Sequence, residues 1–307
     1  MPRLVVIAPD GTDLAVHTWA PAGDGGGEPV LLVHGLASNL RLWDGVGPLL
    51  AAAGHPVAAL DLRGHGTSAK PDAGYDFPTL CADLAAVLDG TGWDRVVVVG
   101  QSMGAELALE LAWRHPPRVL AVVCIDGGWF DLQERFPTWG ACVAALQPPQ
   151  TTGRRLAEIE SQLRRRHPDW PEAGIAGALA CFEHRPDGTV APWLTRDRHL
   201  SLLRALWERR PATRYPEVAA PVLLVPAGDG SVPFPQRDLV EAAARLLPRA
   251  QLRWLAGDHD LHAQHPEAVA ALIHQWLATA GAAPPASGGQ EAAPAFPADH
   301  QIVAEGP

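Results

Sequence analysis

The sequence is poor in lysine and in long apolar runs. Lys70 is the single lysine among 24 basic residues, and the formal net charge is −10 at pH 7. An excess of acid argues against nucleic acid or an anionic membrane as a partner, because both select for a basic face. No stretch reaches the roughly 18 consecutive apolar residues that a membrane span requires. We therefore expect a protein that binds neither nucleic acid nor membrane.

Paired cysteines are also missing. The four cysteines, at positions 81, 124, 142 and 181, show no CxxC spacing. Cys124 lies inside the apolar run 119–125, where we expect a reduced, buried thiol. The first residues lack the long apolar core of a signal peptide. A cytoplasmic location follows as an expectation.

What the sequence contains is an alternation of short apolar runs with longer helical patterns. This rhythm is typical of a mostly parallel sheet that is covered by helices on both faces. The predicted strands are 4–8, 14–19, 30–34, 57–61, 95–100, 119–126, 222–226 and 251–255. The predicted helices are 44–53, 79–88, 105–114, 237–247 and 266–278, each with apolar residues at three- and four-residue spacing.

The alternation stops over residues 128–213. That stretch contains helical patterns at 138–146, 153–165 and 200–208, no convincing strand, and five of the eleven tryptophans. We interpret it as a helical cap inserted into a core formed by residues 1–127 and 214–280; a second small helical domain is the alternative. Residues 281–307 are rich in Ala, Pro and Gly without periodicity, which predicts a disordered tail.

Residues 100–104, Gly-Gln-Ser-Met-Gly, follow the apolar run 95–99 and precede a predicted helix. A serine on such a strand-to-helix turn needs neighbours with almost no side chain, which accounts for both glycines. The turn lifts the hydroxyl of Ser102 clear of the sheet, at the positive end of the following helix. Ser102 is therefore the candidate nucleophile, against the simpler interpretation of a turn serine.

A serine nucleophile needs a base and an orienting carboxylate, and on this type of sheet they follow it along the chain. Asp229 follows the predicted strand 222–226, and His259 follows the predicted strand 251–255. Both lie just beyond the carboxyl ends of their strands, where open α/β sheets place their chemistry. We therefore predict Asp229 as the acid and His259 as the base.

Two alternatives stay open for these roles. Asp126, at the end of the predicted strand 119–126, is a second candidate acid. His262 and His265 lie close enough to His259 in the sequence to compete as the base.

The fourth component is the turn His34-Gly35-Leu36, which ends the predicted strand 30–34. Gly35 allows the backbone to turn so that the amide of Leu36 can face a developing oxyanion. The amide of Met103 is the expected second donor. One such donor typically supplies ~3 to 4 kcal/mol of transition-state stabilisation.

Taken together, these motifs resemble the α/β-hydrolase fold superfamily, in particular its capped single-domain serine hydrolases. The resemblance covers roughly residues 10–278 and includes the segments 31–35, 61–68, 100–104, 229–233 and 265–267. It implies a doubly wound, mostly parallel eight-stranded sheet, with Ser102, Asp229 and His259 as triad and the Leu36 and Met103 amides as oxyanion hole. It also implies that segment 61–68 is a structural loop. Dehalogenases and most epoxide hydrolases of this fold use an aspartate nucleophile, so Ser102 argues against both activities.

The chain departs from the family at two positions. Pro226 stands three residues before Asp229, where the family usually has glycine, and Gln101 replaces the histidine that more often precedes the nucleophile. Gln101, Trp129 and Phe130 are our candidates for the substrate pocket, the last two because they begin the predicted cap directly after a strand end.

We expect a serine hydrolase that cleaves a small-to-medium apolar carboxylic ester or lactone through an acyl-enzyme intermediate. Its partner is a small acyl substrate, and the mechanism requires no cofactor or metal. The same triad serves C–C bond hydrolysis, amide hydrolysis and cofactor-free perhydrolysis, and these stay open as alternatives. A ligand-binding sensor protein with a vestigial triad is the alternative from another class.

Overall fold

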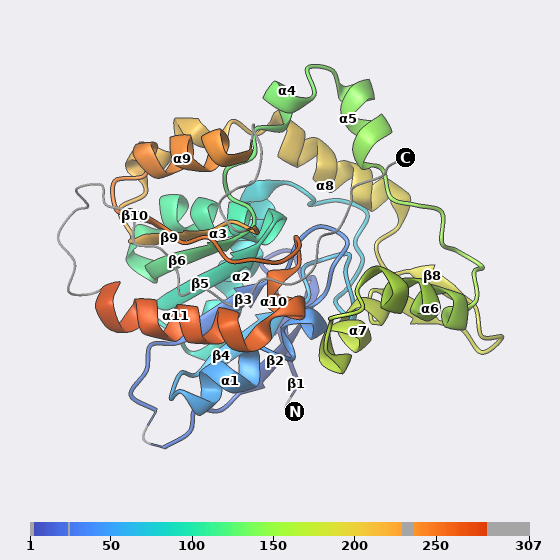
Figure 1. Cartoon of the computed structure of the whole chain (residues 1–307), viewed down its shortest axis with the longest axis horizontal. Helices are drawn as coiled ribbons and strands as arrows, with labels where there is room; N and C mark the ends of the chain where they lie inside the picture. Colours follow the sequence, from blue (N-terminus) through green and yellow to red (C-terminus); the bar gives the residue numbers. More distant parts are fainter. Residues whose placement is uncertain (1–2, 24, 229–235, 281–307) are drawn as a thin grey trace.

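A computed structural model describes residues 3–23, 25–228 and 236–280 of the 307-residue chain. Its centre is a twisted eight-stranded sheet between two helical layers (Figure 1). The strands of this sheet are β1 (Arg3–Ile7), β2 (Asp13–Trp19), β3 (Val30–Val33), β4 (Val57–Leu60), β5 (Val96–Gln101), β6 (Val119–Ile125), β9 (Val222–Val225) and β10 (Ala250–Leu252).

The strand order is β1-β2-β4-β3-β5-β6-β9-β10. β1 pairs with β2, and β2 with β4, in antiparallel fashion, whereas all other neighbours are parallel. β5, the strand before Ser102, therefore lies in the middle of the sheet, beside β6. The predicted doubly wound, mostly parallel sheet of eight strands is confirmed.

Helices cover both faces of this sheet. The main-sheet helices are α1 (Gly47–Ala52), α2 (Phe77–Thr91), α3 (Met103–Arg114), α9 (Gln236–Leu246), α10 (Leu261–Gln264) and α11 (Pro266–Ala280), with short 3-10 helices η1 (Leu40–Trp43), η2 (Pro116–Arg118), η3 (Pro211–Thr213) and η4 (Tyr215–Glu217). α2, α3 and α9 pack on one face, whereas α1 and α11 pack on the other (Figure 1).

The side chains of β5 show why the central strands are apolar throughout. Val96 and Val98 belong to the core cluster under α2 and α3, whereas Val97 and Val99 belong to the cluster under α1 and α11. Because successive strand residues point to opposite faces, a strand covered on both sides is apolar on both faces, as residues 96–99 are before the strand ends at Gly100 and Gln101. All six residues of β5 are buried.

Residues 128–213 leave the sheet after β6 and return to it before β9; we call them the inserted segment. It contains α4 (Leu132–Arg135), α5 (Trp139–Leu146), α6 (Leu156–Arg166), α7 (Glu172–Leu179), β7 (Phe182–His184), β8 (Val190–Pro192) and α8 (Arg196–Glu208). In Figure 1 these elements lie together to one side of the sheet. α7 packs against η1 and α10, so the segment contacts the main fold close to residues 258–264.

The prediction that the inserted segment has no strand is wrong. β7 and β8 form an antiparallel hairpin in which Phe182 pairs with Pro192 and His184 with Val190. Each strand is three residues long, and Glu183 and His184 are exposed. Strands this short carry too few residues for an alternating pattern to be visible in the sequence.

No helix among the described residues is long and apolar enough to cross a membrane. All four cysteines are free, and Cys124 is fully buried as expected. Burial raises the pKa of the Cys124 thiol well above its usual value, which keeps it protonated. The predicted disordered tail, residues 281–307, lies outside the described residues.

Candidate active site

Ser102 occupies the turn between β5 and α3 with a backbone that few non-glycine residues adopt. Its φ is 52° and its ψ is −119°. A Cβ at Gly100 would lie 2.1 Å from the carbonyl oxygen of Gly104, and a Cβ at Gly104 would lie 2.2 Å from that of Val33. Both glycines are thus required by backbone contacts. A strained, over-determined backbone of this kind is typical of functional sites.

The turn after β3 lies directly against Ser102. A Cβ at Gly35 would lie 2.5 Å from Oε1 of Gln101 and 3.1 Å from the Cβ of Ser102, so this close approach favours glycine. Leu36 follows Gly35, and Met103 is the first residue of α3. Amides in the first turn of a helix have no partner within the helix, which leaves the Met103 amide free to bind an oxyanion. The roles of Leu36 and Met103 stay predictions.

The structure brings His259 and Asp126 together. Nδ1 of His259 lies 2.6 Å from Oδ2 of Asp126. The other carboxylate oxygen, Oδ1, accepts hydrogen bonds from the backbone amide of Ala227 at 3.0 Å and from Nε2 of Gln236 at 3.1 Å. Because a carboxylate accepts at Nδ1, that nitrogen carries the imidazole proton. The Nε2 lone pair of His259 is then left to take a proton from a nucleophile.

Asp126 is itself held beside the nucleophile by the sheet. The amide of Ser102 donates to the carbonyl of Ile125 at 3.0 Å, and Asp126 adopts a φ of 38° as the strand ends. A Cβ at Gly127 would lie 2.6 Å from the Cα of Ser102, so the two backbones touch. Asp229, the first choice for the acid, lies outside the described residues. Among those described, Asp126 is the carboxylate that contacts the imidazole.

The competing histidines sit in different surroundings. His262 is fully buried, with its ring centroid 4.3 Å from that of Trp43, and burial lowers its pKa to about 3. His265 directly precedes Pro266, the first residue of α11. His259, by contrast, has a side chain that is 52% exposed, although its carboxylate partner Asp126 is buried.

Two opposing effects act on the pKa of His259. Burial of part of the ring lowers it, but the hydrogen bond to Asp126 and the charges of Asp126, Asp260 and Asp258 raise it. The balance leaves the pKa of His259 above the ordinary value of 6.5. The protonated form of His259 is therefore stabilised by this environment.

Gln101, a candidate for the substrate pocket, is a buried residue. It is 1% exposed, and its Nε2 donates to the main-chain oxygen of His259 at 3.1 Å. A Cβ at Gly35 would lie 2.5 Å from its Oε1. Gln101 thus contacts the turn after β3 and the loop that carries the base, on either side of the nucleophile.

The two aromatic pocket candidates differ in burial. Trp129 is 3% exposed and belongs to the core cluster beneath α3, whereas Phe130 is only partly buried against that cluster. Their ring centroids lie 5.6 Å apart. Phe130 is therefore the more accessible of the two side chains, and the pocket role of both stays a prediction.

Segment 61–68 is held in place by hydrogen bonds and a buried ion pair. Asp61 accepts from the amides of Leu40 at 2.8 Å and Thr67 at 2.7 Å. Arg63 forms a buried ion pair with Asp83, with Nη2 2.6 Å from Oδ1. These contacts give the segment the structural role that the family resemblance implies.

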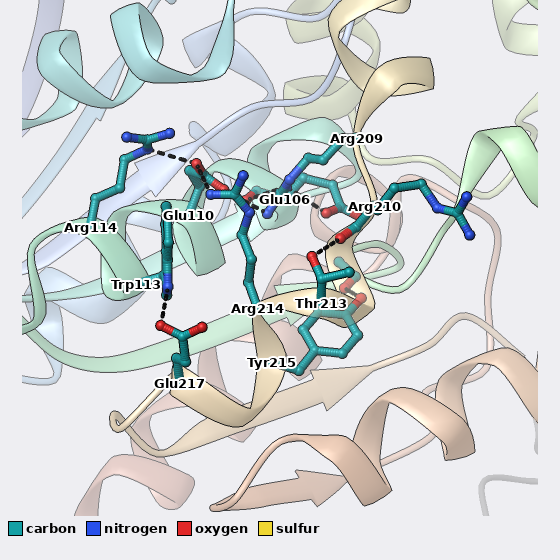
Figure 2. Close-up of polar contacts among 11 residues, drawn as sticks. Glu106, Glu110, Trp113, Arg114, Arg209, Arg210, Thr213, Arg214, Tyr215 and Glu217 are labelled. Atoms are coloured by element: carbon teal, nitrogen blue, oxygen red, sulfur yellow. Dashed lines mark hydrogen bonds and ion pairs between the residues drawn. The ribbon is translucent and has the colours of Figure 1, made fainter.

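A buried ionic network behind the nucleophile helix was not predicted. Arg209, at the end of α8, lies 2.7 Å from Glu106 and 3.0 Å from Glu110, both on α3 (Figure 2). Arg114 and Arg214 also pair with Glu110 (Figure 2). Glu106 and Glu110 lie within an otherwise apolar helical pattern, so the sequence does not reveal that they are buried and paired. Burial raises the pKa of Glu106, and the Arg209 charge opposes that shift.

No cluster of three or more side chains suited to hold a metal ion is present in the part of the chain that the structure describes.

Comparison with known proteins shows to which family the chain belongs. The family model for the alpha/beta hydrolase fold matches residues 28–266. The chain belongs to the α/β-hydrolase family.

Curated relatives of this α/β-hydrolase carry several enzyme names. This chain is 29% identical over 256 residues to the 2-(acetamidomethylene)succinate hydrolase of Mesorhizobium japonicum, and the match covers 79% of this chain and 85% of that enzyme. It is 39% identical over 102 residues to epoxide hydrolase B of Mycobacterium tuberculosis, covering 33% of this chain and 29% of that enzyme. The match thus spans less than a third of the epoxide hydrolase's length.

Comparison with solved structures also supports the α/β-hydrolase fold. The crystal structure of an E-2-(acetamidomethylene)succinate hydrolase superposes with a TM-score of 0.73 at 24% identity, covering 90% of this chain and 99% of that one. At this identity the likeness shows the fold alone. The predicted fold and family are confirmed, and the named relatives support the prediction of an enzyme of the hydrolase class.

Proposed function

We propose that this α/β-hydrolase is a serine hydrolase that cleaves a small-to-medium apolar carboxylic ester or lactone through an acyl-enzyme intermediate. Ser102 is the nucleophile, His259 the base and Asp126 the acid. The observation that carries the proposal is the 2.6 Å contact between His259 and Asp126, made beside a serine on a strained strand-to-helix turn. A base with its tautomer fixed by a buried carboxylate is what a serine needs to become a nucleophile.

In the first half-reaction, Nε2 of His259 removes the proton from Oγ of Ser102 as Oγ bonds to the substrate carbonyl carbon. The amides of Leu36 and Met103 hold the resulting oxyanion. His259 then gives its proton to the alcohol oxygen as the C–O bond breaks. The alcohol leaves, and the acyl group stays on Ser102.

In the second half-reaction, His259 removes a proton from a water molecule that attacks the acyl carbonyl. Collapse of the tetrahedral intermediate breaks the bond to Oγ, and Ser102 regains its proton from His259. The acid product then departs. In a lactone both products are parts of one molecule, and the steps are otherwise the same.

Ser102 separates this proposal from the activity named for epoxide hydrolase B. Epoxide opening in this fold mostly uses an aspartate nucleophile, as the family resemblance implies. We propose instead that only the scaffold is shared with that relative, over the 102 residues that match.

The inserted segment is proposed as the cap that selects the substrate. It contacts the loops on either side of Ser102: Nδ2 of Asn39 donates to the carbonyl of Gly177 at 2.8 Å, and Trp170 donates to Asp258 at 3.1 Å. Phe130 begins this segment and is partly buried against the core. We propose that Phe130 meets the apolar acyl group of the substrate.

Amide hydrolysis is the second candidate, favoured by the 29% identity with an acetamidomethylene-succinate hydrolase over most of both chains. That relative's named substrate is a succinate, whereas Asp126, Asp258 and Asp260 create a negative field at His259. Like charges disfavour each other at short range in a partly dry site. A neutral ester therefore fits this site better than a dianion.

The test is turnover of p-nitrophenyl esters with acyl chains from acetate to laurate, beside matched anilides, a neutral lactone and a carboxylate-bearing ester. We expect ester turnover that Ser102→Ala abolishes, and labelling of Ser102 by a fluorophosphonate probe. Anilide turnover at rates equal to the esters would favour the amidase. Rates no better than Ser102→Ala on every substrate, without labelling, would reject the serine hydrolase and leave a binding protein.

A further inference from the structure

Asp258, the residue before the base, connects the inserted segment to the active site. Its Oδ2 lies 3.0 Å from Nδ1 of His167 and accepts from Nε1 of Trp170 at 3.1 Å. The rings of His167 and Trp170 lie against each other, with centroids 4.2 Å apart. Two donors from the loop between α6 and α7 thus converge on one carboxylate oxygen.

The same residue also orders the backbone around His259. Oδ1 of Asp258 accepts from the amide of Asp260 at 3.0 Å, and the amide of Asp258 donates to Oε1 of Gln264 at 2.6 Å. The two residues beside His259 are therefore both fixed: Asp258 by Gln264, and Asp260 by Asp258. The carboxylate oxygens of Asp258 contact His167, Trp170 and the amide of Asp260, whereas Oδ2 of Asp126 contacts the imidazole of His259.

The loop that supplies the two donors packs against η1 and α10 of the main fold. Trp170 forms a small buried cluster with Ile175, Leu42 and Ala263. A Cβ at Gly174 would lie 2.7 Å from the carbonyl oxygen of Ala263, so α7 makes backbone contact with α10. This part of the inserted segment is a fixed support for the base loop.

His259 has need of such support because its side chain is half exposed. Packing alone does not fix a half-exposed ring, so its orientation depends on the contact with Asp126 and on a well-placed backbone. A misplacement of about 1 Å in a catalytic group can lower a rate by about 10²-fold.

We propose that Asp258 is a positioning residue for the catalytic base, and that His167 and Trp170 act through it. The inserted segment then has a second role besides substrate selection: it completes the geometry of His259. This inference rests on the proposed function, because it requires His259 to act as the base.

The first test removes one donor and keeps the ring. Trp170→Phe deletes the Nε1 donor to Asp258, and we expect kcat for an ester to fall about tenfold with KM within about twofold. Trp207→Phe is the matched control, because Nε1 of Trp207 donates at 2.8 Å to the carbonyl of Phe136 inside the inserted segment. We expect this control to keep the wild-type kcat. Equal kcat values for the two variants would overturn the proposal.

The second test uses His167 and does not depend on Trp170. His167→Asn keeps a donor near the position of Nδ1, whereas His167→Leu removes it. We expect kcat and the rate of fluorophosphonate labelling to fall in His167→Leu and to recover in His167→Asn, with equal melting temperatures. No difference between the pair would contradict the role of Asp258. An inactive, unlabelled wild type would instead reject the serine hydrolase itself, so the two failures are distinguishable.

Discussion

Asp126 and His259 are separated by 133 residues in the chain, yet Oδ2 of Asp126 lies 2.6 Å from Nδ1 of His259. The carboxylate stands at the end of β6, beside the strand that carries Ser102. Ser102 and Asp126, the proposed nucleophile and acid, therefore follow adjacent central strands. His259, the proposed base, lies in the loop after β10.

The first prediction distinguishes the two candidate acids. Asp126→Asn replaces a carboxylate by an amide of the same shape, and loss of the fixed tautomer is expected to lower kcat by about 10⁴-fold. Asp229→Asn is the matched control and is expected to keep kcat within about threefold. Ester hydrolysis by both purified variants is the measurement. The reverse ranking would assign the acid to Asp229.

The second prediction concerns pH. A general base must be neutral, and the pKa of His259 lies above 6.5 in the folded protein. We expect kcat/KM to rise with pH, with a midpoint above that of an ordinary histidine. In Asp126→Asn the midpoint of fluorophosphonate labelling is expected to move to lower pH. A midpoint that does not move would show that Asp126 does not act on His259.

The same shift has a consequence for stability, with a definite sign. Because folding raises the pKa of His259, its pairing with Asp126 stabilises the fold fully below the unfolded-state pKa, and this contribution is lost as pH rises through the folded-state pKa. The free energy of unfolding of wild type relative to His259→Gln should therefore be greatest near pH 5 and decline towards pH 9. Urea titrations across this range measure it. A difference that grows with pH would contradict the assignment.

The third prediction addresses Gln101. Gln101→Met keeps the length of the side chain but loses the donor to the main-chain oxygen of His259, so we expect kcat to fall about tenfold with little change in KM. Gln101→Glu places a carboxylate oxygen against that carbonyl oxygen, and we expect it to lower kcat further than Gln101→Met does. Gln101→His retains a ring N–H donor and should recover part of the loss. Equal activity in all three would remove Gln101 from the positioning of the base.

The fourth prediction concerns the network in Figure 2. Arg209→Met leaves Glu106 buried without its partner, and breaking a buried pair in this way typically costs about 3–5 kcal/mol of stability. Glu106→Gln in the same chain removes the uncompensated charge. The double variant should therefore be more stable than Arg209→Met alone in urea unfolding. If the double variant loses as much free energy of unfolding as the two single variants together, Arg209 and Glu106 do not interact.

The turn around Ser102 could be predicted because its cause is local. Gly100 and Gly104 are required by backbone contacts within a few residues and with the neighbouring strand. The central strands could also be predicted, since burial on both faces produces continuous apolar runs such as 96–99. Both signals are visible in short stretches of sequence.

The sequence narrowed the partner of His259 to two aspartates and favoured Asp229, whereas the structure places Asp126 against the imidazole. Asp126 and Asp229 both follow strands, and the choice depends on which carboxylate reaches the imidazole in three dimensions. The contacts of Asp258 and Gln101 join residues 88 to 158 positions apart, and no local pattern reports them. The glutamates of α3 were hidden for a similar reason: their partner, Arg209, arrives from the far end of the inserted segment.

The position of Asp126 at the end of β6 has a practical consequence for redesign. The backbone amide of Ala227 and the side chain of Gln236 both donate to Oδ1 of Asp126, so a redesign should keep these two donors. Libraries aimed at a new substrate preference should therefore vary Phe130 and the inserted segment and leave Ala227 and Gln236 unchanged, which keeps Asp126 against His259.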